Sequence, residues 1–208
     1  MKSQFNTFWE NINTMVLYSG LNLVFLLCCL PIVTIGPAAA ALGQVMSDEL
    51  RGEYKYIFRS YFRHFKEMLL QGILTELLFG SCLAVLVYAL AFWYSISSPA
   101  AAAAFTVTLL AAVVVSCAMI YAFPLMARFQ NSFRQTIRNA FHLSLAHPGC
   151  SLLLLLLRVF LVSLLYLFPV PSRIFMLVIG FSALSFSTMY ILERIFRPLI
   201  QTSENPGC

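Results

Sequence analysis

The sequence predicts an all-α, polytopic membrane protein: a bundle of about five transmembrane helices, with amphipathic helices at the cytoplasmic interface. Composition is the first reason, because 61% of the 208 residues are apolar and only 10% are charged, against about 45–50% and about 25% in soluble domains. The hydrogen-bonding requirement of lipid is the second reason, because helices are the only structures, apart from closed barrels, that satisfy all of their backbone N–H and C=O groups there. These proportions exclude a disordered chain. With a net charge of only +5, they also exclude a nucleic-acid partner.

Five apolar runs are long enough to cross a membrane, whose hydrocarbon core requires roughly 20 helical residues. The predicted crossings are residues 17–35, 68–94, 100–127, 151–168 and 174–192. They form one membrane domain, residues 1–198, followed by a short polar tail, residues 199–208.

The basic residues predict the orientation, since cytoplasmic connections carry the excess of Lys and Arg. The first and third connections and the C-terminal tail hold ten of them, whereas the other side holds only Lys2 and Arg173. We therefore expect a bacterial inner-membrane protein with its N-terminus outside and its C-terminus in the cytoplasm.

The first crossing contains Pro31, Gly36 and Pro37, which interrupt helices. Its apolar run is longer than a signal-peptide core and no basic cluster precedes it, so we do not interpret it as a signal peptide. A helix break near Gly36 and Pro37 is expected, with residues 38–46 at the cytoplasmic interface or dipping inward. The alternative is a fully re-entrant half-helix, which would reverse the N-terminus. Pro124 is expected to bend the third crossing.

The first connection predicts a helix on the inner leaflet. Its aromatic residues fall on one arc of a helical projection and its basic residues on the neighbouring arc. The basic residues are Lys55, Arg59, Arg63 and Lys66. Anionic lipid headgroups are the expected contact of these side chains, and the alternative is a cytoplasmic protein partner.

The third connection predicts a second amphipathic helix, whose polar face is richer in amides than in charge. That face holds Asn131, Arg134, Gln135, Arg138, Asn139 and His142. Amide and guanidinium groups on an exposed face suit hydrogen bonding to a protein. This face is therefore the candidate docking surface for a partner, and a merely solvated face is the alternative.

Two charged residues lie inside the predicted crossings, Glu76 and Arg158. Each lies nine residues from the cytoplasmic end of its helix, so the two are expected at the same depth and are a candidate ion pair. One interpretation is a structural salt bridge that fixes which helices are neighbours. The other is the centre of a small transporter.

Enzymatic motifs are missing from the sequence. We find no nucleophile elbow, zinc-protease motif or Gly-rich phosphate loop. The three His and six Cys residues have no metal-ligand spacing. The expectation is a protein without enzymatic activity, cofactor or metal.

Two segments resemble the YesL family of bacterial multi-pass membrane proteins. They are residues 30–38, LPIVTIGPA, and residues 121–129, YAFPLMARF, which are followed by Arg138, Asn139 and Ala140. The resemblance covers residues 8–198 and implies a protein of unknown biochemical function. Members of that family are often encoded beside carbohydrate-uptake transporters and sensor-kinase systems, which is an association and not a mechanism.

The resemblance and the residue patterns lead to one functional hypothesis. The chain is expected to be an accessory or regulatory partner of a sugar transporter permease or a sensor kinase. Its working surface would be the cytoplasmic face built from residues 38–66 and 128–147. The alternative is a small transporter that uses Glu76 and Arg158.

Overall fold

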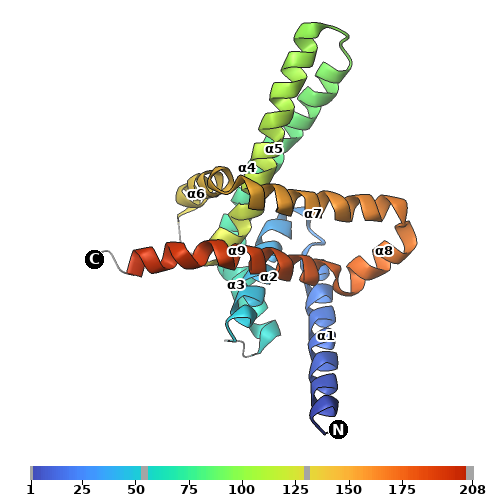
Figure 1. Ribbon diagram of the computed structural model, residues 1–208, viewed down its shortest axis with the longest axis vertical. Helices are drawn as coiled ribbons and strands as arrows, with labels where there is room; N and C mark the ends of the chain where they lie inside the picture. Colours follow the sequence, from blue (N-terminus) through green and yellow to red (C-terminus); the bar gives the residue numbers. More distant parts are fainter. Residues whose placement is uncertain (1, 53–55, 129–131, 205–208) are drawn as a thin grey trace.

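The computed structural model describes residues 2–52, 56–128 and 132–204. The described residues form helices and no strands, which confirms the all-α class (Figure 1). The elements are α1 (Lys2–Cys28), the 3₁₀ helix η1 (Ile32–Thr34), α2 (Ile35–Leu50), α3 (Ile57–Glu67), α4 (Leu69–Tyr94), α5 (Pro99–Arg128), α6 (Phe133–Ala146), α7 (Pro148–Leu167), α8 (Pro169–Phe175), the π-helix η2 (Met176–Gly180) and α9 (Phe181–Glu204).

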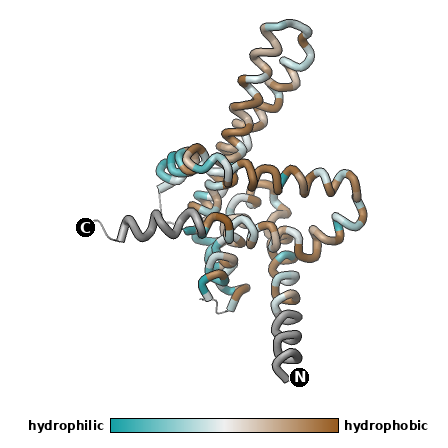
Figure 2. The backbone as a smooth tube through the Cα atoms, in the orientation of Figure 1, coloured by the Kyte–Doolittle hydropathy of each residue, from teal (hydrophilic) through white to brown (hydrophobic). Residues whose placement is uncertain are grey.

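Four segments of the described chain are long and apolar enough to cross a membrane: Leu69–Tyr94, Pro99–Arg128, Pro148–Leu167 and Pro169–Glu193. They correspond to the last four predicted crossings. Their large side chains are widely exposed, as Val85 on α4 (67%) and Phe160 on α7 (62%) illustrate, and Figure 2 shows hydrophobic residues predominating along α7. Such surfaces indicate a multi-pass membrane protein, because a soluble monomer rarely exposes large apolar patches.

The helix α2 lies at the centre of the molecule, where α1, α3, α4, α5 and α9 all pack against it. Its small residues Ala38, Ala40 and Ala41 are completely buried, which lets neighbouring backbones approach closely. From this centre the α4–α5 hairpin projects in one direction, whereas α7 and α9 run crosswise to that direction (Figure 1). The four candidate spans are therefore not parallel to one another in this structure.

The first predicted crossing, residues 17–35, is not a single helix. The helix α1 ends at Cys28, and α2 begins at Ile35 and turns back. The N-terminal end of α1 and the C-terminal end of α2 therefore lie toward the same end of Figure 1. The break therefore lies near Pro31, earlier than the predicted position at Gly36 and Pro37. The apolar part of α1, Thr14–Cys28, is shorter than the four candidate spans.

The chemistry of this turn explains where the break occurs. Pro31 has no N–H to continue the helical hydrogen bonds of α1. The Thr34 hydroxyl donates to the carbonyl oxygens of Cys28 (2.6 Å) and Pro31 (2.7 Å) and so closes the turn. Gly36 and Pro37 lie in the first turn of α2, where the missing N–H of a proline costs nothing.

The predicted bend at Pro124 falls within one continuous helix. Pro124 lies inside α5, which continues to Arg128. Every residue from Ile120 to Ala127 is buried, so packing on both sides of the proline holds this stretch in helical conformation despite the lost hydrogen bond.

Candidate functional site

The helices α2 and α4 approach each other closely at the centre of the fold. A Cβ atom added to Gly36 would lie 2.8 Å from the carbonyl oxygen of Gly72, and one added to Gly72 would lie 2.7 Å from the backbone nitrogen of Pro37. No side chain fits at these distances, so both positions require glycine. The pair brings the first turn of α2 directly onto α4.

Glu76 lies one helical turn beyond Gly72, and the close approach of α2 brings the Gly36 N–H within reach of its carboxylate. Its Oε2 accepts the backbone N–H of Gly36 at 2.5 Å. The N-terminus of a helix carries unsatisfied N–H groups and a partial positive charge, both of which favour a carboxylate. The intramembrane acid is thus satisfied by the start of α2.

The structure does not bring Glu76 and Arg158 together, which corrects the predicted ion pair. Neither residue takes part in the ion pairs found in the described part of the chain. The Nε of Arg158 is buried and has no hydrogen-bond partner among the described residues. Matching depth along two helices did not imply contact between them, and the transporter hypothesis loses the geometry on which it rested.

Asn22 on α1 is a second buried polar centre, completely shielded from solvent. Its Nδ2 donates to the carbonyl oxygens of Met176 (2.8 Å) and Leu177 (2.7 Å), and its Oδ1 accepts the N–H of Ser182 at 3.2 Å. Met176 and Leu177 are the first two residues of the π-helix η2, and Ser182 follows its end. π-helical turns frequently occur at functional positions. Asn22 therefore fixes α1 against the last membrane segment.

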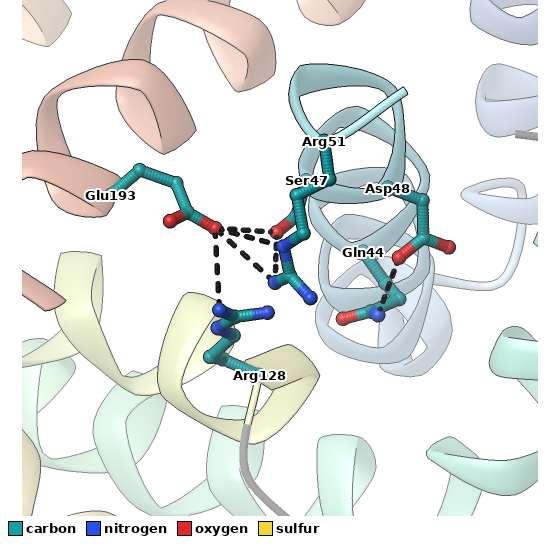
Figure 3. A network of polar contacts seen from close by, with 6 residues as sticks. All are labelled: Gln44, Ser47, Asp48, Arg51, Arg128 and Glu193. Atoms are coloured by element: carbon teal, nitrogen blue, oxygen red, sulfur yellow. Dashed lines mark hydrogen bonds and ion pairs between the residues drawn. The ribbon is translucent and has the colours of Figure 1, made fainter. Parts of the chain in front are cut away.

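A network of polar side chains joins α2, α5 and α9 (Figure 3). The Oε1 of Glu193 accepts hydrogen bonds from Ser47 Oγ (3.0 Å) and from Arg51 Nη2 (3.2 Å) and Nε (3.3 Å), and it lies 3.8 Å from Arg128 Nη2. Sequence analysis missed this network because it counted Arg51 and Arg128 only as loop charges. The available signal was Glu193, the acid that ends the last candidate span.

The predicted lipid-binding helix α3 has its basic and aromatic residues on neighbouring sides. Arg59, Arg63 and Lys66 are exposed, and Tyr61 is completely buried. Two of the aromatic residues expected in the acyl layer, Phe58 and Phe62, are exposed. Lys55 lies outside the described residues. Burial raises the pKa of the Tyr61 phenol above its usual range, so the phenol remains neutral.

One polar contact, between His64 and Asp48, also ties α3 to α2. The Nε2 of His64 lies 3.7 Å from Asp48 Oδ2, and its Nδ1 lies 3.3 Å from Glu67 Oε2. Gln44 Nε2 donates to Asp48 Oδ1 at 2.9 Å (Figure 3). The basic face of α3 therefore belongs to a helix that is attached to the centre of the fold.

The helix α6 presents its predicted polar face to the outside. Its covered residues are Thr136, Ala140, Leu143 and Ser144, and its exposed residues include Arg134, Gln135, Arg138 and His142. Asn139 is half-buried. Asn131 lies outside the described residues.

Two hydrogen bonds between elements hold α6 in place. Gln71 Nε2 on α4 donates to Thr136 Oγ1 at 3.1 Å, and Ser151 Oγ on α7 donates to the carbonyl oxygen of Ser144 at 2.8 Å. The covered side of α6 is thereby fixed to two apolar helices, while its polar side stays free of the rest of the described chain.

Comparison with known proteins found one family model that matches a segment of the chain. The model of a family described as "Protein of unknown function, DUF624" matches residues 16–90. This segment contains the α1–α2 turn, the Gly36–Gly72 contact and Glu76, so the centre of the fold is the part that is similar to that family. The comparisons with curated proteins and with solved structures found no match.

Proposed function

We propose that this chain is a multi-pass protein of the bacterial inner membrane, without enzymatic activity, that acts as an accessory or regulatory partner of another membrane complex. The resemblance to the YesL family supports a carbohydrate-uptake transporter or a sensor kinase as that complex. The docking surface is the polar face of α6, formed by Arg134, Gln135, Arg138 and His142, and extended in the sequence by Asn131 and Asn139.

The exposure of this face on a fixed helix carries the proposal. Arginine is enriched at protein interfaces, and its planar guanidinium forms two parallel hydrogen bonds with a carboxylate. Because α6 is bonded to α4 and α7, little conformational entropy is lost when a partner binds. These properties favour the interpretation that the polar face of α6 binds a protein over the interpretation that it is merely solvated.

The basic face of α3 has a separate proposed role at anionic lipid headgroups. Arg59, Arg63 and Lys66 are exposed, and a basic residue near an anionic surface contributes about 1 kcal/mol to membrane attachment. Lys55 extends the same basic cluster in the sequence.

The proposed topology has both termini in the cytoplasm. The return of α2 beside α1 supports the re-entrant alternative for the first apolar segment, and the four candidate spans then bring the C-terminus back to the side of the N-terminus. This arrangement keeps the basic first and third connections and the C-terminal tail inside and leaves Arg173 outside. Green fluorescent protein fused to the N-terminus should fluoresce, and alkaline phosphatase fused there should be inactive. An active phosphatase fusion would place the N-terminus outside.

Copurification tests the docking surface. The tagged protein is isolated from its native membrane after mild crosslinking, and its partners are identified by mass spectrometry. We expect a stoichiometric permease or sensor kinase with the unaltered chain, and its loss with Arg134→Ala combined with Arg138→Ala. The matched control, Arg59→Ala combined with Arg63→Ala, removes the same charge from α3 and should retain the partner. Full retention by the α6 variant would refute docking through this face.

A further inference from the structure

Arg158 lies in the middle of an apolar helix. It is the eleventh residue of α7, Pro148–Leu167, so its Cα is about 14 Å from either end at a rise of about 1.5 Å per residue. An arginine near a helix end can extend its guanidinium group to the headgroup layer, but the side chain of an arginine at mid-span does not reach that far. An anion is therefore needed at the depth of Arg158.

The chain itself does not supply that anion in the part that the structure describes. Two acidic residues lie in the four candidate spans, Glu76 and Glu193. Glu76 is bound to the N–H of Gly36, and Glu193 is bound to Ser47 and Arg51. The buried Nε of Arg158 has no hydrogen-bond partner among the described residues.

The face of α7 that carries Arg158 changes from covered to open along the helix. Ser151 and Leu154, before Arg158, are 3% and 1% exposed, whereas Val162 and Tyr166, after it, are 66% and 88% exposed. At about 100° per residue, Ser151, Arg158, Val162 and Tyr166 fall on one side of the helix. Arg158 thus lies at the edge of an apolar surface that nothing in the described chain covers.

We propose that a transmembrane helix of a partner membrane protein covers this surface and pairs a mid-span Asp or Glu with Arg158. The inference rests on the proposed accessory function and names the chemistry of its partner. A lipid phosphate is disfavoured as the anion because of the depth of Arg158. A buried charge pair sets which helices associate and at what depth, since an unpaired charge in lipid is costly.

A photocrosslinker placed beside Arg158 tests the proposal in native membranes. The residue p-benzoylphenylalanine is introduced at position 162, one turn beyond Arg158, or at position 160 on the opposite side of α7. Both positions are similarly exposed, Val162 at 66% and Phe160 at 62%. We expect position 162, but not position 160, to crosslink to a transmembrane segment that contains an acidic residue, as identified by mass spectrometry of the linked peptide.

Charge variants of Arg158 test whether its charge holds the partner helix that crosslinks to position 162. Truncating one partner of a buried charge pair weakens association by about tenfold or more, so Arg158→Leu should remove most of the crosslink and Arg158→Lys should retain it. Leucine suits an apolar span, and size-exclusion chromatography in detergent checks that the variant is folded. Exchanging the charges, with Arg158→Asp and the partner's acid replaced by Arg, should restore the crosslink.

Three results would overturn the proposal: crosslinking at position 162 to phospholipid alone, crosslinking to a segment without an acidic residue, or a crosslink that Arg158→Leu leaves unchanged. The α6 experiment separates the two proposals. If the Arg134 and Arg138 variants lose the partner while position 162 labels only lipid, this inference fails and the accessory function stands. If neither experiment captures a protein, both are refuted.

Discussion

Glu76 on α4 accepts the backbone N–H of Gly36, forty residues earlier, at the first turn of α2. An acid inside an apolar helix thus has a helix N-terminus as its partner in place of a cation. This contact holds α2 at the centre of the fold, where five other helices pack against it.

Replacement of Glu76 should therefore reduce stability. Glu76→Leu leaves the Gly36 N–H without an acceptor, and we expect the free energy of unfolding in bicelles to fall by about 1–3 kcal/mol. Glu76→Gln keeps an oxygen acceptor and should cost less. Glu67→Gln, at an exposed acid of α3, serves as the control, and equal effects at the two positions would contradict the role of the Gly36 contact.

A methyl group at Gly72 should force α2 and α4 apart. The added Cβ of Gly72→Ala would lie 2.7 Å from the nitrogen of Pro37, and overpacking of this kind costs about 1–3 kcal/mol. Gly80→Ala is the matched control on the same helix, because nothing lies within 4 Å of its added Cβ. Alanine there should stabilise the helix by about 0.5–1 kcal/mol. Thermal unfolding of both variants checks the difference in sign.

Loss of the Asn22 side chain should release η2 from α1. Asn22→Ala leaves the carbonyl oxygens of Met176 and Leu177 without this donor, at about 1–3 kcal/mol for each buried group left unpaired. Hydrogen exchange should quicken around residues 176–182. Leu23→Ala, at a neighbouring position that is 52% exposed, should leave exchange there unchanged, and similar exchange in both variants would refute the proposed link.

The Glu193 network should show unequal couplings. A double-mutant cycle between Arg51 and Glu193 is expected to give about 0.5–3 kcal/mol, since Arg51 is hydrogen-bonded to the carboxylate at 3.2 Å. The cycle between Arg128 and Glu193 should give less, because that pair is 3.8 Å apart. Chemical unfolding of the single and double Ala variants measures both values. A larger coupling for Arg128 would contradict the geometry of Figure 3.

The exposed and buried faces of α3 and α6 could be predicted in part from local spacing. On α6, a repeat of three to four residues separated buried Thr136 and Ala140 from exposed Arg134 and Arg138. On α3 the same repeat groups the aromatic residues on one side, but it did not show that Tyr61 is buried whereas Phe58 and Phe62 are exposed. Helical periodicity gives the direction of a side chain but not the extent of the neighbouring element that covers it.

The sequence by itself determined the all-α class and the four long apolar helices, because composition and the length of apolar runs are local properties and lipid admits few backbone structures. Tertiary structure alone decided which polar groups meet. Glu76 and Arg158 have matching positions along their helices, yet the Gly36–Gly72 contact gives Glu76 a different partner. Such pairing depends on how closely two backbones approach in space, and spacing along one helix carries no information about that distance.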